Sequence, residues 1–473
     1  KIQMKNFLFI CFIMLFISQL NAQKNWTLQE CIEYAHEHNI QVKQQKLSTE
    51  INETTLKESK LDALPSLNAG ASHNFSYGRA LDETTYEYTE NQEVQSSNFS
   101  VNSSVTLFQG FQKWNRIKQN KFLLQSELAN LEQLKNDISL NVASAYLQIL
   151  FNKELVEVSQ NQLEITRQQI ERTEKLVEAG SLARGSLLEI KSQAANEELN
   201  LVNAQNQLET SFLNLTQLLE LDSIGNFDIV RPDFSEIDKD LPLKPVDSIF
   251  SVAAGVLPRV ESAKYNLEAK EKALDVAKGG LSPSLSLGFA YGSRYSSIRD
   301  KLTGYEEGTV PIGETVSGEE VIATQRFPTY SDYPFSDQIQ DNANTSIRLS
   351  LSIPIFNGLK ANYAVDNARV SKLNAEYSLE STKNNLYKDI QSARSDALSA
   401  WKKYEAAKKT VQSMEESFKY TKQKFEVGLV NSVEYNTAKN NLTKAKSDLL
   451  QAKYEYIFKT RILDFYQGKQ LEI

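Results

Sequence analysis

The chain has 473 residues, with 52 Lys and Arg residues and 60 Asp and Glu residues, which give a formal net charge of −8. Because it also has no basic stretch, a typical nucleic-acid-binding protein is excluded. Its 18 Gly and 10 Pro residues are too few for collagen-like or Pro/Gly-rich disordered chains, and they allow long helices. The mean hydropathy of −0.43 excludes a polytopic helical membrane protein, but not a membrane β-barrel, whose strands are polar at every second residue.

Residues 1–22 are predicted to be a secretory signal peptide. Lys5 supplies a short positive segment, and Phe7–Ile17 is an apolar run too short to span a bilayer. A small residue precedes the expected cleavage site before Gln23; an uncleaved anchor is the alternative. Cleavage leaves Cys31 as the only cysteine, so the mature chain is expected to lack an intramolecular disulfide.

The rest of the chain is predicted to be two copies of one unit. The segment Leu-Pro-Ser-Leu at 64–67 recurs as Ser-Pro-Ser-Leu at 282–285. Leu-Phe-Gln-Gly at 107–110 recurs as Ile-Phe-Asn-Gly at 355–358, which is a longer shift along the chain, and a Glu-x-Gly segment recurs at that same longer shift. The second copy therefore contains one insertion between its strand start and its strand end.

Each copy is expected to contain one helix, two strands and two long helices, in that order. The elements predicted for the first copy (23–224) are a helix over 26–63, strands over 66–77 and 98–108, and long helices over 111–179 and 186–224. A Pro- and Asp-rich linker over 225–248 follows. The elements predicted for the second copy (249–473) are a helix over 249–280, strands over 284–292 and 345–355, and long helices over 359–427 and 432–467.

The long helices are predicted from the absence of helix breakers. Phe111–Ala179 and Leu359–Val427 contain no Gly or Pro, and at about 1.5 Å per residue each helix would be on the order of 100 Å long. Their apolar residues recur at steps of three and four, which is typical of a coiled-coil-like stripe. A Gly-containing break and a second long helix follow each of them, so two antiparallel hairpins per chain are expected.

The four predicted strands alternate between apolar and polar residues with period two. Each has about 9–11 residues, the length that a tilted strand needs to cross an outer membrane. The apolar side suits lipid, and the polar side, which includes Arg348, suits a water-filled lumen. A soluble sandwich with one wet face is the alternative, but four strands in two hairpins are few for a core.

Four strands cannot close a barrel, and an open edge in lipid leaves backbone groups unpaired at several kcal/mol each. The chain is therefore expected to share a barrel with copies of itself around a rotational axis. Three chains would supply twelve strands, enough to enclose an aqueous channel, and twelve helices. The predicted fold class is mainly α with membrane β, in which a trimeric 12-strand β-barrel is continued by a 12-helix α-barrel.

The sequence resembles the outer-membrane efflux protein family, the TolC-like channels of tripartite exporters. The resemblance rests on the opening segment Trp26–Cys31, both Pro-Ser-Leu strand starts, both Phe-x-Gly junctions and the two Gly-containing hairpin tips. It implies a homotrimer in the outer membrane with a helical barrel in the periplasm and no cofactor. It also implies a duct for efflux or type I secretion that works with a periplasmic adaptor and an inner-membrane RND or ABC pump.

The resemblance further implies that the hairpin tips, Gly180 with Ser181 and Gly428 with Leu429, dock the adaptor. Glycine at these positions lets the chain turn and lets another backbone approach closely. A plain helix C-cap is the alternative explanation of both glycines, and the two explanations are compatible.

The family's periplasmic entrance maps to Phe425, Ser186, Glu189 and Glu434, but this chain departs from the family pattern. The acidic ring keeps Glu434 and has Thr437 at its second position, and the gating tyrosine is replaced by Phe425. A lumen-facing arginine is replaced by Val430. Three Glu434 side chains are expected to form a weaker acidic ring, closed partly by apolar contact through Phe425; a solvated helix charge is the alternative.

No enzyme motif is present: the chain lacks a P-loop, an H-E-x-x-H segment and a G-x-S-x-G segment. His36 and His38 form an H-x-H pair, but residues i and i+2 of a helix point about 200° apart, which suits joint metal binding poorly. No metal is therefore expected, and a partner must supply the work of transport. The main alternative to a duct is a non-transporting trimeric coiled-coil surface protein of the adhesin type, and a soluble helical scaffold is a third hypothesis.

Overall fold

The structure is a computed structural model that describes residues 24–79, 81, 88–222, 227–232, 244–469 and 471, so the expected signal peptide lies outside the described residues. The chain divides into two compact units. The first unit (unit 1) comprises the residues up to Thr54, Lys121–Ala269 and Leu373–Ile473, and the second (unit 2) comprises Thr55–Asn120 and Lys270–Lys372.

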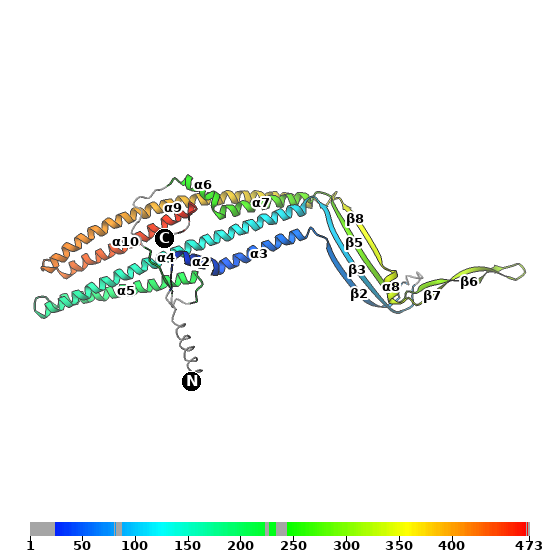
Figure 1. The fold of residues 1–473 in the computed structure, drawn as a ribbon, viewed down its shortest axis with the longest axis horizontal. Coiled ribbons are helices and arrows are strands. Elements are labelled where there is room, and N and C mark those ends of the chain that lie inside the picture. Colours follow the sequence, from blue (N-terminus) through cyan, green and yellow to red (C-terminus); the bar gives the residue numbers. More distant parts are fainter. Residues whose placement is uncertain are drawn as a thin grey trace, which may run out of the picture. The chain divides into compact units, whose positions relative to one another are not determined.

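Unit 1 contains most of two antiparallel helical hairpins (Figure 1). The first hairpin consists of α4 (Gln112–Glu178) and α5 (Arg184–Leu218), and the second consists of α9 (Lys360–Glu426) and α10 (Ser432–Tyr466). The shorter helices are α2 (Leu28–His38), α3 (Ile40–Leu61), α6 (Val246–Val256) and α7 (Pro258–Gly279). Within the described residues, no helix is both long and apolar enough to cross a membrane.

The first helix of each copy is interrupted, whereas one continuous helix was expected over 26–63 and another over 249–280. Asn39 separates α2 from α3 because its backbone is extended, and its side chain donates to the carbonyl of Leu218 at 3.1 Å. In the second copy Leu257 separates α6 from α7, since a residue that precedes a proline, here Pro258, avoids the helical region. Helix α6 also begins at Val246, inside the expected linker.

The elements of the two copies recur at constant shifts. Helix α2 begins at Leu28, and its counterpart α6 begins at Val246. The same number of residues separates α3 from α7, and the first Pro-Ser-Leu strand start from the second. A longer shift relates the start of α4 to that of α9, and the same longer shift relates α5 to α10. The insertion in the second copy therefore lies between its two membrane-type strands and leaves the helices unchanged in length.

Unit 1 has two apolar cores. The first joins α2, α4 and α5 to Tyr454 and Ile457 of α10, and Val142, Ile149 and Leu215 have no exposed side-chain surface there. The second joins α6, α7, α9 and α10 around Leu386 and Ile390, which are also fully buried. Burial of such a side chain contributes roughly 1.5–3 kcal/mol to folding, so these stripes hold the short helices on the long ones.

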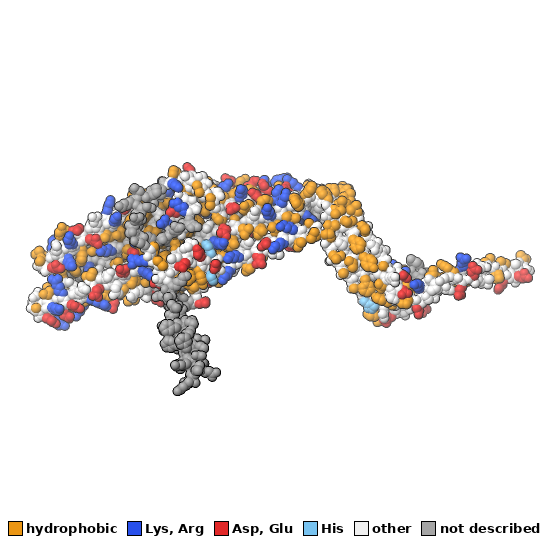
Figure 2. All heavy atoms as spheres, viewed as in Figure 1, with side chains coloured by type: hydrophobic (Ala, Val, Ile, Leu, Met, Phe, Trp, Pro, Cys, Tyr) orange, Lys and Arg blue, Asp and Glu red, His pale blue; other side chains and the backbone are white. Residues whose placement is uncertain are grey.

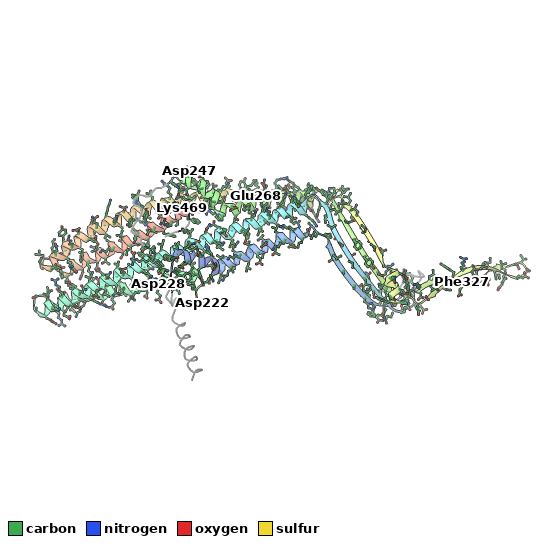
Figure 3. All side chains as sticks on the ribbon, viewed as in Figure 1. Asp222, Asp228, Asp247, Glu268, Phe327 and Lys469 are labelled. Carbon is green, nitrogen blue, oxygen red and sulfur yellow. The ribbon has the colours of Figure 1, made fainter. Side chains whose placement is uncertain are left out.

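Polar contacts beside the cores attach the linker region to the helices. A short strand, β4 (Phe227–Ile229), lies where only a linker was expected, and it pairs in parallel with β1 (Lys24–Trp26) at the start of the first copy. Tyr146 donates to the carbonyl of Val230 at 2.6 Å. In the second copy, Asp247 of α6, labelled in Figure 3, accepts a hydrogen bond from Tyr387 of α9 at 3.0 Å.

Unit 2 contains a four-stranded antiparallel sheet with the order β2-β3-β5-β8 (Figure 1). Its strands are β2 (Ser66–Gly78), β3 (Gln92–Gln109), β5 (Ser284–Ser296) and β8 (Asn344–Ser352). Strand β3 begins six residues before the expected start at 98, and β5 ends four residues after the expected end at 292. The central pairing of β3 with β5 joins the two copies, and β2 and β8 are the end strands.

The strand register gives this sheet one apolar and one polar face. Leu67, Phe289 and Ile347 share a row on one face, whereas Asn68, Asn102 and Ser346 share the adjacent row on the other. Figure 2 shows hydrophobic side chains gathered over these strands. The apolar face is uncovered, since Leu67 is 73% exposed and Ile347 is 75% exposed. A contiguous exposed apolar face of this kind indicates contact with lipid or another protein.

The segment between the predicted strands over 284–292 and 345–355 contains regular structure. Strands β6 (Lys301–Glu314) and β7 (Glu320–Ser331) form a separate antiparallel hairpin, and α8 (Phe335–Asp341) follows it. Phe327, labelled in Figure 3, covers Gly308, where an added Cβ would lie 2.9 Å from the ring.

A close backbone contact in unit 2 joins the strand-to-helix junction of the first copy to the end of α7. Gly110 has a φ of +56°, and a Cβ added there would lie 2.4 Å from the carbonyl oxygen of Gly279. Gly358, its counterpart in the second copy, has a φ of +65°, but an added Cβ would meet nothing within 4 Å. Both positions favour glycine by conformation, and Gly110 also requires it by contact.

We expect Gly110→Ala to lower the free energy of unfolding more than Gly358→Ala does. Both substitutions place alanine in the left-handed region, at about 1–2 kcal/mol, but only the first also separates two backbone segments. Urea denaturation in detergent, followed by tryptophan fluorescence, measures both losses. Equal losses for the two variants would contradict the role assigned to the Gly110–Gly279 contact.

Candidate functional site

The tip of each long hairpin is a glycine turn. Gly180 and Gly428 have φ values of +73° and +77°. The backbone N–H of Ser181 donates to the carbonyl of Leu176 at 2.8 Å, and that of Leu429 donates to the carbonyl of Lys424 at 2.8 Å. These bonds are those of the Schellman motif, so both glycines are helix C-caps. A Cβ added at either glycine would meet nothing within 4 Å, so both tips are also open to another chain.

Apolar side chains at the tips are exposed. Leu429 is 75% exposed and Val427 is 71% exposed. Leu188 and Val433, which lie near the starts of α5 and α10, are exposed as well. Apolar groups gathered at the end of a helical hairpin are typical of a surface that contacts another protein.

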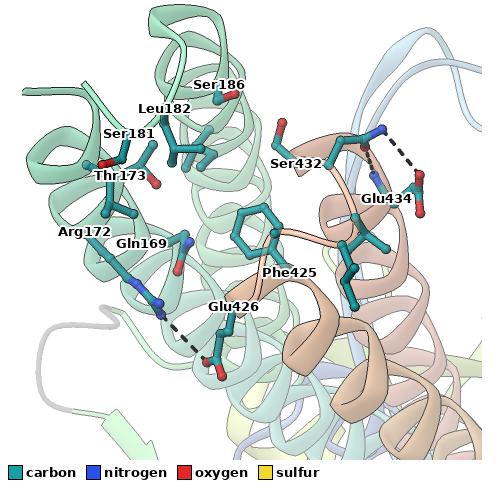
Figure 4. A pocket seen from close by; sticks show the side chains of 16 residues that line it. Gln169, Arg172, Thr173, Ser181, Leu182, Ser186, Phe425, Glu426, Ser432 and Glu434 are labelled. Atoms are coloured by element: carbon teal, nitrogen blue, oxygen red, sulfur yellow. Dashed lines mark hydrogen bonds and ion pairs between the residues drawn. The ribbon is translucent and has the colours of Figure 1, made fainter. Parts of the chain in front are cut away.

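A cavity of about 510 Å³ lies between the two tips in unit 1 (Figure 4). Together with Val430, its lining includes six of the eight predicted tip and entrance residues: Ser181, Ser186, Phe425, Gly428, Leu429 and Glu434. Gly180 and Glu189 lie outside its lining. An ion pair between Arg172 of α4 and Glu426 of α9, at 3.8 Å, spans the two hairpins.

Glu434 lies in the first turn of α10, with its carboxylate exposed. The side-chain oxygen of Asn431 accepts from the backbone N–H of Glu434 at 2.9 Å, and the Asn431 amide donates to the Glu434 carboxylate at 3.4 Å (Figure 4). A negative charge at this end of a helix is favourable because the exposed N–H groups carry partial positive charge. Thr437, at the second position of the expected ring, instead donates to the Val433 carbonyl of its own helix at 2.8 Å.

Phe425 packs within its own hairpin. Its ring stacks on that of Tyr435 with the centroids 4.6 Å apart. Tyr435 is buried, and burial raises the pKa of its hydroxyl group. The aromatic pair thus joins α9 to α10 directly beneath the second tip.

A row of polar contacts joins α5 of the first hairpin to α10 of the second. Glu189 accepts a hydrogen bond from Ser432, and the Gln193 amide donates to Asn440 at 2.8 Å. One turn further along α5, Glu197 pairs with Lys439 at 3.2 Å. The three α5 residues are spaced at four, which places them on one helix face.

The Lys439–Glu197 pair is the most buried part of this row, since both side chains are only 4% exposed. Lys439 also donates to the Gln162 carbonyl at 3.2 Å and to Thr166, whose hydroxyl donates to Glu197. Burial lowers the pKa of the Lys439 ammonium group, and Glu197 opposes that effect. Removal of one member of such a pair leaves an uncompensated buried charge, which costs about 3–5 kcal/mol.

Sequence reasoning did not identify this pair, because its members lie far apart in the chain and neither stands in a recognisable motif. The spacing of Glu189, Gln193 and Glu197 by four residues is compatible with one polar helix face, but it carries no information about the partner helix.

The remaining sequence candidates lie elsewhere. Arg348 is on the polar face of β8, opposite Gly288 of β5. His36 contacts Ser139 at 2.9 Å, whereas His38 stacks on Tyr34, so the two imidazoles have different neighbours. Among the residues that the structure describes, no group of three or more His, Cys, Asp or Glu side chains could hold a metal ion.

Three comparisons relate the chain to known proteins. It is 21% identical to the outer membrane protein TolC of Escherichia coli over 411 residues, which cover 85% of this chain and 74% of TolC. It is 20% identical to the alkaline protease secretion protein AprF of Pseudomonas aeruginosa, over 84% of this chain and 76% of AprF. The Campylobacter jejuni CmeC outer membrane channel has the same fold, with a TM-score of 0.75 at 16% identity over 93% of this chain and 85% of CmeC.

The family model described as "Outer membrane efflux protein" matches residues 31–220 and 253–463, which together make up most of the chain and include both copies of the unit. The chain therefore belongs to the outer membrane efflux protein family.

Proposed function

We propose that three copies of this chain form an outer-membrane duct, through which a periplasmic adaptor and an inner-membrane RND or ABC pump export their substrates. The observation that carries the proposal is the four-stranded sheet, which has one apolar face, one polar face and two end strands. That sheet belongs to the same chain as two long helical hairpins.

Membership of the family makes the chain an outer-membrane protein with its helices in the periplasm. The family consists of efflux channels, not of enzymes, and we propose neither a catalytic site nor a cofactor. Because AprF is named for protease secretion, the proposal includes type I secretion as well as efflux.

The two end strands of the sheet support an assembly of several copies, and three copies are proposed here. In lipid, β2 and β8 must pair with strands of other chains, since each unpaired backbone group costs several kcal/mol there. Pairing of β8 with β2 of a neighbouring copy around a threefold axis closes a barrel of twelve strands, which is wide enough for an aqueous lumen. The two hairpins of each chain then supply the twelve helices of the periplasmic α-barrel.

The adaptor is proposed to dock at the tips, around Gly180, Ser181, Gly428 and Leu429. Three features support this assignment: open space around both glycines, the exposed apolar side chains, and the cavity between the tips. The glycines serve as helix caps at the same time, so the two roles coexist.

We expect Leu429→Asp to abolish export without loss of the trimer from the outer membrane. The side chain is 75% exposed, so its replacement leaves the fold intact while a charge replaces an apolar contact with the adaptor. Complementation of a deletion strain measures export, and outer-membrane fractionation followed by unheated gel electrophoresis measures the trimer. Gln423→Asp, which adds the same charge in the last turn of α9, is the control and retains export.

Two outcomes would contradict these proposals. Full complementation by Leu429→Asp would refute docking at this tip. A deletion strain with unchanged secretion and compound sensitivity would refute the duct.

The periplasmic entrance is proposed to be lined by Glu434 and Phe425 of the second hairpin with Ser186 and Glu189 of the first. Three Glu434 carboxylates would form an acidic ring, since the side chain is exposed at the start of α10. Phe425 supports the ring indirectly through its contact with Tyr435.

We expect Glu434→Gln to reduce both the cation selectivity of the channel and its block by multivalent cations. Glutamine retains the length and the capping geometry of the side chain, and it removes only the charge. Single-channel recording in planar bilayers measures both properties. If the variant and the unsubstituted channel behave alike, Glu434 is only a helix-capping charge.

The buried Lys439–Glu197 pair is proposed to hold the two hairpins of each chain together when the entrance is closed. It connects α10 to α4 and α5 near the tips, so movement of one hairpin away from the other would separate the charges. The rest of the polar row, Glu189 with Ser432 and Gln193 with Asn440, extends this connection toward the tip.

We expect Lys439→Met to raise the open probability of the channel and to lower its stability by about 3–5 kcal/mol, since it leaves the Glu197 carboxylate buried and unpaired. The reversed pair, Lys439→Glu with Glu197→Lys, should restore part of the lost stability and bring the open probability part of the way back. The control is Lys446→Met. Lys446 lies on the same helix as Lys439 and forms an exposed ion pair with Glu415, so its replacement should have little effect on open probability or stability. Single-channel recording and urea denaturation provide the two measurements, and an unchanged open probability in Lys439→Met would contradict the proposal.

A further inference from the structure

We infer that Arg348 makes the barrel section of the duct favour anions, and that it is a selectivity-determining residue there. The inference rests on the proposed trimeric duct, and it adds a charge preference to the part of the lumen that the membrane surrounds.

The polar face of the sheet is almost free of charge. Its side chains are chiefly Ser and Asn, and they hydrogen-bond with cations and anions alike. Arg348 of β8 and Arg294 of β5 are the only ionised side chains in the polar-face register of these four strands. Glu93, the only carboxylate in the strands, lies opposite Tyr77 in the register of the other face. The sign of the potential along this face is therefore set by arginine.

Arg348 lies in a row without a carboxylate. Along that row the register places it beside Gly288 of β5, which is followed by Ser104 of β3 and Ser66 of β2. The two serine hydroxyls are within 3.1 Å of each other. The Arg348 side chain is exposed, and no ion pair joins it to an acidic group in the described part of the chain.

Closure of the barrel does not supply the missing carboxylate. Strand β8 is an end strand, and its neighbour across the subunit boundary would be β2 of the next copy. Strand β2, Ser66–Gly78, contains no Asp or Glu. Three uncompensated guanidinium groups, one from each chain, would therefore face the lumen at the same level.

The position of this ring strengthens its effect. The lumen there is enclosed by the sheet and by lipid, and low-dielectric walls concentrate the field of a ring of like charges. Arginine keeps its positive charge throughout the physiological pH range, so the preference persists there. The molecule as a whole has a net charge of −8, so this preference is local to the barrel and opposite to the overall charge.

The test is the reversal potential of the purified trimer in a planar bilayer under a KCl gradient. Arg348→Gln should lower the chloride-to-potassium permeability ratio by about twofold near 0.01 M salt, where the Debye length is about 30 Å, and should have little effect at 1 M, where it is about 3 Å. Arg348→Lys retains the charge and should retain the ratio. Arg326→Gln removes an arginine that is paired with Glu307 on the β6–β7 hairpin, and it should leave the ratio unchanged.

The outcomes separate the inference from the function on which it rests. A conducting channel in which Arg348→Gln leaves the ratio unchanged at low salt overturns the inference and leaves the duct intact. An equal shift in Arg326→Gln also overturns it, since the effect would then be one of overall charge. A purified protein that forms no trimer and no conducting channel overturns the duct itself and the inference with it.

Discussion

The need to pair every backbone group at the edges of the sheet governs the rest of the molecule. One chain supplies four strands, with β2 and β8 at the ends. In an aqueous setting such edges could remain open, but in lipid they must pair with another chain. The same sheet has an apolar face and a polar face, so closure of the proposed barrel by copies of the chain would determine at once which face meets lipid and which encloses water. In the proposed duct, the number of strands in each chain would thus leave a single subunit incomplete.

Because the unit is duplicated, both copies use the same order of helices and membrane-type strands. The helices recur at constant shifts with unchanged lengths, and Ile138 and Val142 of α4 have the buried counterparts Leu386 and Ile390 in α9. The first helix of each copy is interrupted for a different reason. The side chain of Asn39 bonds to the backbone in the first copy, and Pro258 follows the interruption in the second. The extra residues form β6 and β7 between two strands, where an insertion disturbs neither the helical stripes nor the sheet register.

Features with a local signal could be predicted from the sequence, whereas features that depend on distant contacts could not. The bounds of α4 and α9 differ from the predicted ones by one residue at each end, because the absence of Gly and Pro and the glycine turns are read directly from the chain. The β1–β4 pair was missed, since strands of three residues depend on tertiary contacts such as that of Tyr146. The β6–β7 hairpin was missed because its glycines and prolines are typical of a loop. At the candidate site, the tips had a signal in Gly180 and Gly428, but the Lys439–Glu197 pair had none.

The charged groups of the proposed duct are of two kinds: some act within one chain, and others act only between chains. Lys439 and Glu197 are paired inside each subunit, so the hold that they exert on the hairpins is complete before assembly. Glu434 and Arg348 are exposed in the single chain, and each would form a ring only when three copies assemble. Subunit folding would therefore set the resting position of the hairpins, whereas assembly would create the two charge filters of opposite sign. Because the filters lie in different units of the chain, substitutions in one ring are expected to leave the other unchanged.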